Sequence, residues 1–173
     1  MGVLHGWKHC PRCAGPLENG GDRAECAACG FVQWANSQPT ACALVVDEAG
    51  RLLLGRRATK LWHGYWDTPG GFLEEGEEPL AALRRELREE TGLEIEPVEF
   101  VGGYTDRYGD GEEAPFTLNL YWTVRVVGGE ERPDDDVSEL RWFAPDELPG
   151  ADEIAFDNVA RVIEAWRSGR DGA

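Results

Sequence analysis

Residues Gly71–Leu93 read GFLEEGEEPLAALRRELREETGL, and the fold expected for the chain is built around this stretch. Pro79 suits the first turn of a helix, where its missing N–H costs nothing, and Gly92 suits the position that ends one. Three leucines recur between them at helical spacing and form one apolar stripe: Leu80, Leu83 and Leu87. The stretch therefore predicts an amphipathic helix bounded by Pro79 and Gly92.

Three carboxylates share one face of this predicted helix. Glu86, Glu89 and Glu90 stand at positions i, i+3 and i+4. Like charges at such spacings cost about 0.2–0.5 kcal/mol per pair in a bare helix. Neighbouring arginines offset part of that repulsion, and a hard divalent cation held by oxygen ligands would offset it better. The alternative interpretation is a solvated acidic face.

The whole stretch resembles the signature of the Nudix hydrolases. That signature runs Gly, five residues, Glu, seven residues, then Arg-Glu-aliphatic-any-Glu-Glu-any-Gly-aliphatic. Every fixed position is filled here, from Gly71 through Glu77 to the run Arg85–Leu93. The preceding segment, Tyr65-Trp-Asp-Thr-Pro-Gly-Gly71, resembles the aromatic and Pro-Gly-Gly lead-in that Nudix proteins commonly carry.

The resemblance implies an α/β fold: a Nudix α/β/α sandwich with a mixed β-sheet, expected over residues 38–168. It also implies a reaction, the hydrolysis of a nucleoside diphosphate linked to another group, with Mg²⁺ or Mn²⁺ as the cofactor. Divalent ions clamp phosphate oxygens, neutralise developing charge and lower the pKa of a bound water. The expected substrate is a small-molecule nucleotide, and a homodimer is a state left open.

The resemblance also implies roles for residues in and before the box. Glu86 and Glu90 are the expected main metal ligands, and Glu89 is expected to ligate or to act as base. Arg85 is expected to orient the glutamates, and Glu77 to support the site or the metal. A backbone carbonyl from Gly70 is an expected extra oxygen ligand. Some Nudix enzymes take the general base from a loop outside the box, and five acidic residues are candidates: Glu112, Glu113, Asp135, Asp136 and Glu139.

Four cysteines near the N-terminus form two CxxC pairs, Cys10 with Cys13 and Cys26 with Cys29. Two such pairs at this distance are typical of a zinc ribbon, in which each pair gives two thiolates to one tetrahedral Zn²⁺. Four sulfur ligands leave no open position, so the predicted metal is structural. We expect this ribbon to occupy residues 1–35, and a pair of disulfides is the alternative.

Composition narrows the class of protein. The chain has 173 residues, a formal net charge of −16 and a hydrophobic fraction of 42%, which fits a folded domain with a small appendage. Such negative charge should repel nucleic-acid backbones and anionic membranes. The N-terminus has no apolar segment typical of a secretory signal, and no run of about 18 apolar residues occurs. We therefore expect a cytoplasmic protein with no membrane or nucleic-acid partner.

Apolar runs predict the strands and the last helix. Residues 40–46, TACALVV, form an unbroken apolar run after Thr40, which predicts a strand buried on both faces, with Cys42 in the core. Residues 47–50 are expected to turn the chain into a second strand, 51–57, as a hairpin. Later strands are expected within 94–104, 116–127 and 140–143, and an amphipathic helix from Ile154 to Arg167.

The substrate is the least determined part of the sequence. A zinc ribbon ahead of a Nudix domain resembles the NADH pyrophosphatases and a group that acts on FAD or ADP-ribose. The downstream Ser-Gln-Pro-Trp motif of the NADH-cleaving enzymes is missing from residues 101–115, which read VGGYTDRYGDGEEAP. The candidate substrate contacts are Arg56, Arg57 and Tyr104. The alternative for the two arginines is a solvated strand end, and the alternative for Tyr104 is a position in the core. The alternatives are an NTP or RNA-cap pyrophosphohydrolase, or a non-catalytic nucleotide-binding regulator.

Overall fold

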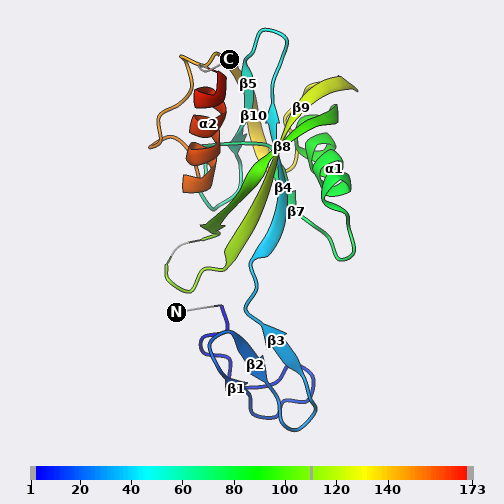
Figure 1. The fold of residues 1–173 in the computed structure, drawn as a ribbon, viewed down its shortest axis with the longest axis vertical. Coiled ribbons are helices and arrows are strands. Elements are labelled where there is room, and N and C mark those ends of the chain that lie inside the picture. The colour runs from blue at the N-terminus through cyan, green and yellow to red at the C-terminus, as the bar shows by residue number, and fades with distance from the viewer. Residues whose placement is uncertain (1–2, 110, 171–173) are drawn as a thin grey trace. The chain divides into compact units, whose positions relative to one another are not determined.

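The computed structural model describes residues 3–109 and 111–170, with Arg170 described by its backbone alone. The chain forms two compact units: residues up to Gln38 together with Arg107–Thr117, and Pro39–Asp106 together with the residues from Leu118 onward. Asp110, within the polar segment 106–115, lies outside the described residues. Figure 1 shows the elements of both units along the chain.

The first unit contains a small antiparallel sheet and little core. Its strands are β1 (Glu18–Asn19), β2 (Arg23–Glu25) and β3 (Val32–Trp34), in the order β1-β2-β3. The buried apolar side chains between residues 3 and 38 are few: Leu4, Cys10, Ala24 and Cys26. Two of these four are cysteines, so apolar burial contributes little to the stability of this ribbon.

The second unit carries two sheets. One has the order β7-β4-β9-β8 and comprises β7 (Gly70–Phe72), β4 (Gln38–Val45), β9 (Phe116–Gly129) and β8 (Leu93–Arg107). The other has the order β10-β5-β6 and comprises β10 (Val137–Phe143), β5 (Leu52–Arg57) and β6 (Trp66–Asp67). The helices are α1 (Pro79–Thr91) and α2 (Asp157–Arg170). In Figure 1 the two helices lie on opposite sides of the sheets.

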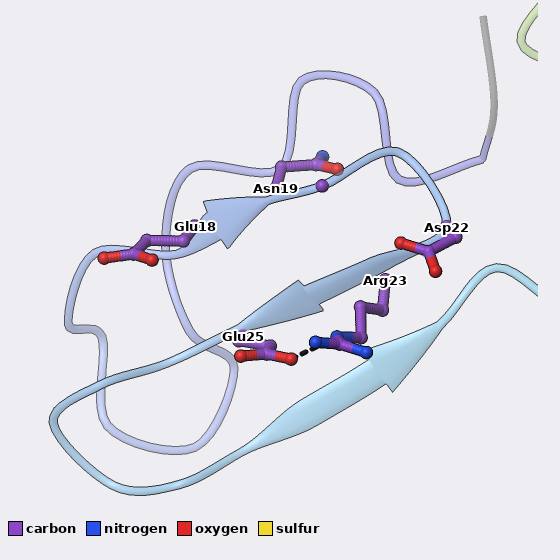
Figure 2. Close-up of a pocket in the computed structure, with 6 residues that line it drawn as sticks. Glu18, Asn19, Asp22, Arg23 and Glu25 are labelled. Atoms are coloured by element: carbon purple, nitrogen blue, oxygen red, sulfur yellow. Dashed lines mark ion pairs between the residues drawn. The ribbon is translucent and has the colours of Figure 1, made fainter.

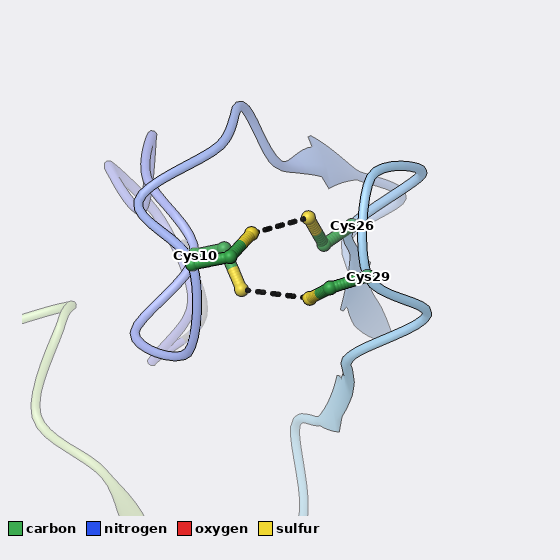
Figure 3. A group of neighbouring side chains, drawn as sticks. Cys10, Cys26 and Cys29 are labelled. Carbon is green, nitrogen blue, oxygen red and sulfur yellow. Dashed lines mark hydrogen bonds between the residues drawn. The ribbon is translucent and has the colours of Figure 1, made fainter.

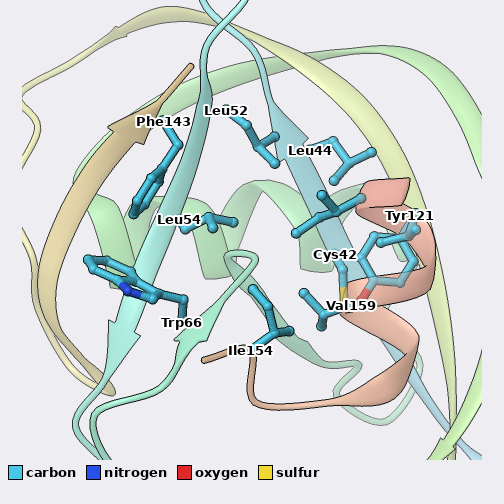
Figure 4. Close-up of a cluster of buried hydrophobic side chains, with 11 residues drawn as sticks. Cys42, Leu44, Leu52, Leu54, Trp66, Tyr121, Phe143, Ile154 and Val159 are labelled. Carbon is cyan, nitrogen blue, oxygen red and sulfur yellow. The ribbon is translucent and has the colours of Figure 1, made fainter. Parts of the chain in front are cut away.

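Alternation along two buried strands explains these layers. On β4, Cys42 and Leu44 pack in a cluster that includes side chains of α2, whereas Ala41, Ala43 and Val45 pack in a second cluster that includes side chains of α1. Successive residues of a strand point to opposite faces, so an unbroken apolar run serves two cores at once. Figure 4 shows the α2 cluster, which includes Leu44, Leu52, Leu54 and Val159. The predicted α/β class is confirmed, and Cys42 is buried as expected.

Helix α1 begins and ends where the sequence predicts. Pro79 occupies its first turn, and Gly92 ends it with a left-handed φ of 70° while its N–H bonds to the Arg88 carbonyl. Leu83 and Leu87 are fully buried, but Leu80 is 38% exposed, so its place in the core stripe is wrong. Leu80 lies in the first turn of the helix, and its exposure shows that the sheet does not cover that turn.

The expected hairpin after β4 is only partly right. The turn forms, because the Gly50 N–H donates to the Asp47 carbonyl and the Arg51 N–H donates to the Asp47 carboxylate at 2.8 Å. One bridge, Val46 to Leu52, follows it, and then β4 and β5 part into different sheets. Each strand finds other partners, since β5 pairs with β10 and β6 while β4 pairs with β7.

The last helix begins three residues later than expected. Ile154 is not helical, because it forms a parallel bridge with Trp66 and its side chain packs in the α2 cluster. The backbone supports this bridge from both sides: the Trp66 N–H donates to the Glu153 carbonyl, and the Ala155 N–H donates to the Trp66 carbonyl, each at 2.9 Å. Apolar periodicity alone could not distinguish a packed extended residue from the first helical one.

Candidate active site and metal centre

Arg85 organises the exposed side of the box helix. Its guanidinium donates two hydrogen bonds to the Glu77 carboxylate, at 2.8 and 2.9 Å, and one to the Phe72 carbonyl. Its Nη1 also donates to Glu86 at 2.8 Å and to Glu89 at 3.1 Å. The Arg85 hydrogen bonds lower the pKa of Glu77 to about 2, and in turn they raise the pKa of Arg85. Arg85 thus fixes the box loop to the helix while holding two of its glutamates.

The three box glutamates are not equivalent. Each residue turns a helix by about 100°, so Glu89 points farther from the buried stripe than Glu86 or Glu90 does. The Glu89 side chain is accordingly 49% exposed, and that of Glu86 only 15%. A Cβ on Gly71 would overlap the Glu86 carboxylate, so the glycine in β7 leaves the space that this carboxylate fills. Burial raises the pKa of Glu86, an effect that the Arg85 guanidinium opposes.

Glu90 is the most deeply buried acid of the box. Its Oε2 accepts a hydrogen bond from the Gly70 N–H at 2.9 Å. Burial is the largest cause of its raised pKa, and the charges of Asp67, Glu86 and Asp136 raise it further, whereas the Gly70 N–H lowers it. A buried carboxylate among like charges is unfavourable without a cation, so this donor set fits a divalent ion. We call Asp67, Glu86, Glu90 and Asp136 the carboxylate cluster.

Gly70 is required by packing on a neighbouring strand. It pairs with Cys42 of β4, and a Cβ at Gly70 would overlap the Ala41 carbonyl oxygen. Its φ of 144° adds a second reason for glycine. The Gly70 N–H contacts the box through Glu90, and the expected role of its carbonyl as a metal ligand stays a prediction.

A small cavity of about 10 Å³ lies beside Glu90, with room on the scale of one water or ion. Arg57, Asp67 and Asp136 line it together with Glu90. Sequence reasoning missed Asp67, which is part of the YWDTPGG lead-in. The Arg57 guanidinium donates to the Asp67 carboxylate at 2.7 Å, and burial raises the pKa of Asp67 against that ion pair. The one signal for it was a charged residue inside an otherwise aromatic and glycine-rich lead-in.

Asp136 reaches the cavity because the segment before β10 caps the box helix. The Arg132 N–H donates to the Thr91 carbonyl at 2.9 Å, and the Asp134 N–H donates to the Glu90 carbonyl at 3.1 Å. The last carbonyls of a helix lack partners within it, so these bonds satisfy them. The same segment continues to Asp136, whose carbonyl accepts the Ala58 N–H.

The structure brings the remaining candidates to other places. Glu139 is exposed and pairs with Arg56 at 3.2 Å. Asp135 is exposed, and Glu112 and Glu113 are exposed residues of the first unit. Tyr104 packs edge-on against Tyr121 at 5.6 Å in the α2 cluster, as a core position would.

The four cysteines form the second site, which we call the cysteine cluster. Their sulfurs all lie within 4.8 Å of one another, and the Cys10–Cys29 and Cys13–Cys26 pairs are 3.6 Å apart (Figure 3). A tetrahedral zinc with bonds of about 2.3 Å would hold its sulfurs about 3.8 Å apart. Among the residues that the structure describes, no other set of three or more Cys, His, Asp or Glu side chains comes this close.

The thiols of the cluster are electrostatically unequal. Burial acts to raise the pKa of Cys10, but hydrogen bonds from the Arg12 and Cys13 backbone lower it to about 7. A backbone hydrogen bond from Phe31 acts to lower the pKa of Cys29, but burial and the other thiols raise it to about 12. Without a metal, neighbouring thiolates thus oppose one another, and a bound cation would remove that opposition.

The ribbon also has a hollow of about 400 Å³, shown in Figure 2. Its charged lining consists of Glu18, Asp22 and Glu25 with a single guanidinium, Arg23. Arg23 pairs with Glu25, so this hollow offers no basic surface to a phosphate backbone.

Comparison with known proteins gives consistent results. The profile of the NUDIX domain matches residues 36–165. The chain is 31% identical over 169 residues to a protein named NAD-capped RNA hydrolase NudC from Stutzerimonas stutzeri, covering 95% of this chain and 58% of that one. It is 29% identical to a protein named ADP-ribose pyrophosphatase from Methanocaldococcus jannaschii, covering 72% of each. The chain thus spans only about half the length of several relatives with the NudC name.

Solved structures show the same fold. A crystal structure of a NUDIX hydrolase from Nitrosomonas europaea superimposes with a TM-score of 0.78 at 22% identity, covering 96% of this chain and 93% of that one. The predicted Nudix arrangement of sheets and helices is therefore confirmed. Neither helix in the described part of the chain has the length and apolar character that crossing a membrane requires.

Proposed function

The chain belongs to the Nudix family, and from that premise we propose that it hydrolyses the pyrophosphate bond of a nucleoside diphosphate linked to another group. A dinucleotide or nucleotide sugar such as ADP-ribose, NADH or FAD is the proposed substrate. The observation that carries the proposal is the burial of Glu90 among Asp67, Glu86 and Asp136. A buried carboxylate among like charges favours a bound cation, and a pyrophosphate needs such a cation for hydrolysis.

Glu86 and Glu90 are the proposed ligands of Mg²⁺ or Mn²⁺, with Glu89 ligating from the exposed side. When bound, the ion would neutralise charge on the phosphate oxygens and make a bound water more acidic. Glu86 fits this role because its carboxylate occupies the space over Gly71 and is held there by Arg85 at 2.8 Å. Arg85 is a positioning residue, since it contacts the glutamates and the Phe72 carbonyl.

Asp136 is our choice of general base among the acidic residues outside the box. It lines the same cavity as Glu90, whereas Glu139 is engaged by Arg56. Asp136 is an exposed residue, which suits a group that must take a proton from water and release it again. Glu89 is the second choice, because its side chain is also exposed and already pairs with Arg85.

The cysteine cluster is the proposed site of one structural Zn²⁺, held by Cys10, Cys13, Cys26 and Cys29. The spacing of the sulfurs supports it, as does the scarcity of apolar burial in the ribbon. We keep the predicted boundaries, a ribbon at residues 1–35 and a Nudix domain at residues 38–168.

A second candidate substrate is RNA that carries a dinucleotide cap. The name of the NudC relatives favours it, and the bond to be broken is again a pyrophosphate. The net charge of −16 and the acidic hollow of the ribbon count against a grip on the RNA backbone. A non-catalytic regulator is disfavoured, because every fixed box position is filled.

The test is a hydrolysis screen with Mg²⁺ and with Mn²⁺, in which the products are identified. The substrates are ADP-ribose, NADH, FAD, CoA, dinucleoside polyphosphates, NTPs and NAD-capped RNA. We expect cleavage between the two phosphates of a dinucleotide or nucleotide sugar, abolished by a chelator. Activity on NTPs alone would exclude the dinucleotide proposal, and no metal-dependent hydrolysis of any substrate would refute the enzyme.

A further inference from the structure

One segment next to the carboxylate cluster has a charge opposite to that of the rest of the chain. Residues 55–66, GRRATKLWHGYW, contain three Arg or Lys residues and one His but no Asp or Glu, in a protein with a formal net charge of −16. We call them the basic aromatic hairpin, because they join β5 to β6. An anionic ligand with an aromatic group would find both of its features matched here.

Backbone and guanidinium bonds hold this hairpin in one shape. The Arg57 N–H donates to the Tyr65 carbonyl, and the Gly64 N–H donates to the Arg57 carbonyl, both at 2.9 Å. At the tip, the Tyr65 N–H donates to the Trp62 carbonyl at 3.1 Å. The Arg57 Nε donates to the Leu61 carbonyl at 3.1 Å, so the loop is tied to its own strand. A rigid presentation lowers the cost of binding a ligand.

Trp62 sits at the tip of the hairpin in an unfavourable conformation. Its φ of 57° lies in the left-handed region, which a bulky residue rarely adopts. Even so, the side chain is 38% exposed, so core packing does not account for the residue type. Glycine or asparagine would suit this backbone better if the position were only a turn. Strain of this kind at an exposed aromatic residue is typical of a binding site.

Two aromatic neighbours fix the orientation of the indole. Its ring meets Tyr65 at 5.2 Å and Phe156 at 6.5 Å between centroids, both in an edge-to-face arrangement. Rings packed this way hold the side chain in one rotamer. The exposed part of the indole is therefore a fixed planar surface rather than a mobile one.

Arg57 connects this surface to the carboxylate cluster. Its guanidinium lies 5.0 Å from the centre of the Phe156 ring, and its Nη1 donates to Asp67 at 2.7 Å. Arg57 and Asp67 line the cavity that contains Glu90, whereas Phe156 contacts Trp62. This series of contacts joins Trp62 to the cavity of Glu90, so that one nucleotide could span the two.

We propose that Trp62 is a substrate-binding residue, on whose indole the base of the nucleotide stacks. The inference rests on the proposed function for the identity of the ligand. Every base has a π-face, so this contact selects nucleotides as a class and does not discriminate among bases. The group linked to the nucleoside diphosphate is then selected by other residues.

The experiment compares two ligands that share phosphate chemistry but differ in the base. AMP and inorganic pyrophosphate are bound to wild type, Trp62→Asn and Trp62→Phe, and affinities are measured by calorimetry in the presence of Mg²⁺. Asn tolerates the left-handed backbone, so the first variant should fold, and Phe keeps an aromatic ring. Trp34→Ala is the control, because Trp34 is also an exposed tryptophan, at 48% against 38% for Trp62, and lies on the ribbon.

We expect Trp62→Asn to weaken AMP binding about ten-fold and Trp62→Phe to weaken it by less than about three-fold. Pyrophosphate binding should be unchanged in both variants, and Trp34→Ala should leave both ligands unaffected. Unchanged AMP affinity in Trp62→Asn, or an equal loss for pyrophosphate, would overturn the role of Trp62. Because binding is measured directly, a failed hydrolysis screen would refute the enzyme without deciding this result.

Discussion

The cysteine cluster and the carboxylate cluster are the two candidate metal sites of the molecule, and the chain assembles them in opposite ways. The cysteine sulfurs come from two short CxxC turns and lie as close as 3.6 Å. The carboxylates come from β6, from α1 and from the segment before β10, and they do not converge as the sulfurs do. The first cluster is compact through local spacing, whereas the second depends on the whole second unit.

The neighbours of each cluster explain the difference. Thiols repel one another only where they ionise, whereas carboxylates are ordinarily charged and repel. Two arginines lie beside the acids of the box: Arg85 contacts Glu86 and Glu89, and Arg57 contacts Asp67. The box helix packs on a hydrophobic core that includes Leu83 and Leu87, whereas the ribbon has almost no core. A metal should therefore be needed for the fold in the ribbon and for activity at the box.

The largest expected effect is the loss of the ribbon when one thiolate is removed. Structural zinc contributes about 10–16 kcal/mol to the folding of isolated zinc fingers, far more than this ribbon gains from apolar burial. Cys26→Ser should therefore lose zinc and unfold β1 to β3, while the amides of β4 and α1 remain protected from hydrogen exchange.

Wild type should contain about one zinc per chain by elemental analysis. Cys42→Ala serves as the control, because Cys42 is buried in the α2 cluster and should leave the zinc content unchanged. If Cys26→Ser keeps an intact ribbon, or if the wild-type cysteines prove to be disulfide-bonded, the contrast between the clusters fails.

The second effect is on catalysis at the box. Glu90→Gln removes a charged ligand that helps supply several kcal/mol of transition-state stabilisation, which corresponds to a loss of about 10³-fold in kcat. Removing one of four neighbouring carboxylates should also raise the unfolding temperature of the metal-free protein. Rate assays with the substrate from the screen and a thermal melt without metal check the two results.

Glu89→Gln is the matched variant, since Glu89 belongs to the same helix but its side chain is 49% exposed. It should lose less activity than Glu90→Gln and should not gain stability. Full activity in Glu90→Gln would show that the buried carboxylate is not a ligand.

Substitution of one glycine at each cluster, Gly71 at the box and Gly15 in the ribbon, compares how tightly the two clusters are packed. A Cβ at Gly71 would overlap the Glu86 carboxylate, and displacement of a catalytic group by about 1 Å can cost about 10²-fold in rate. We therefore expect Gly71→Ala to lower kcat about 10²-fold, with helix α1 intact by circular dichroism.

The smallest effect is expected for Gly15→Ala in the ribbon. A Cβ there would lie 3.3 Å from the Cys13 sulfur, which a shift of a few tenths of an ångström relieves. Zinc affinity, measured by competition with a chelator, should fall by less than about ten-fold. The proposed order would be wrong if zinc affinity in Gly15→Ala fell by a larger factor than kcat in Gly71→Ala.

Much of the molecule follows from sequence because the signals are local. The bounds of α1 rest on Pro79 and Gly92, whose backbone preferences act at their own positions. Each CxxC spacing places two of the four sulfurs on one turn, although the contacts at 3.6 Å join one turn to the other. The burial of β4 on both faces can be predicted from its sequence, because a solvent-facing side would have placed a polar residue at every second position of the apolar run.

What only the tertiary structure decided is which distant residues meet the box. Asp67 reaches Glu90 through the pairing of β6 with β5, and Asp136 does so because the segment before β10 caps α1. The exposure of Leu80 depends on how far the sheet extends beneath the helix. Sequence by itself specified the ligands that share one turn or one helix, because helical and turn spacings are fixed by the backbone. It could not specify contacts across strands, because these depend on sheet order, which no local spacing encodes.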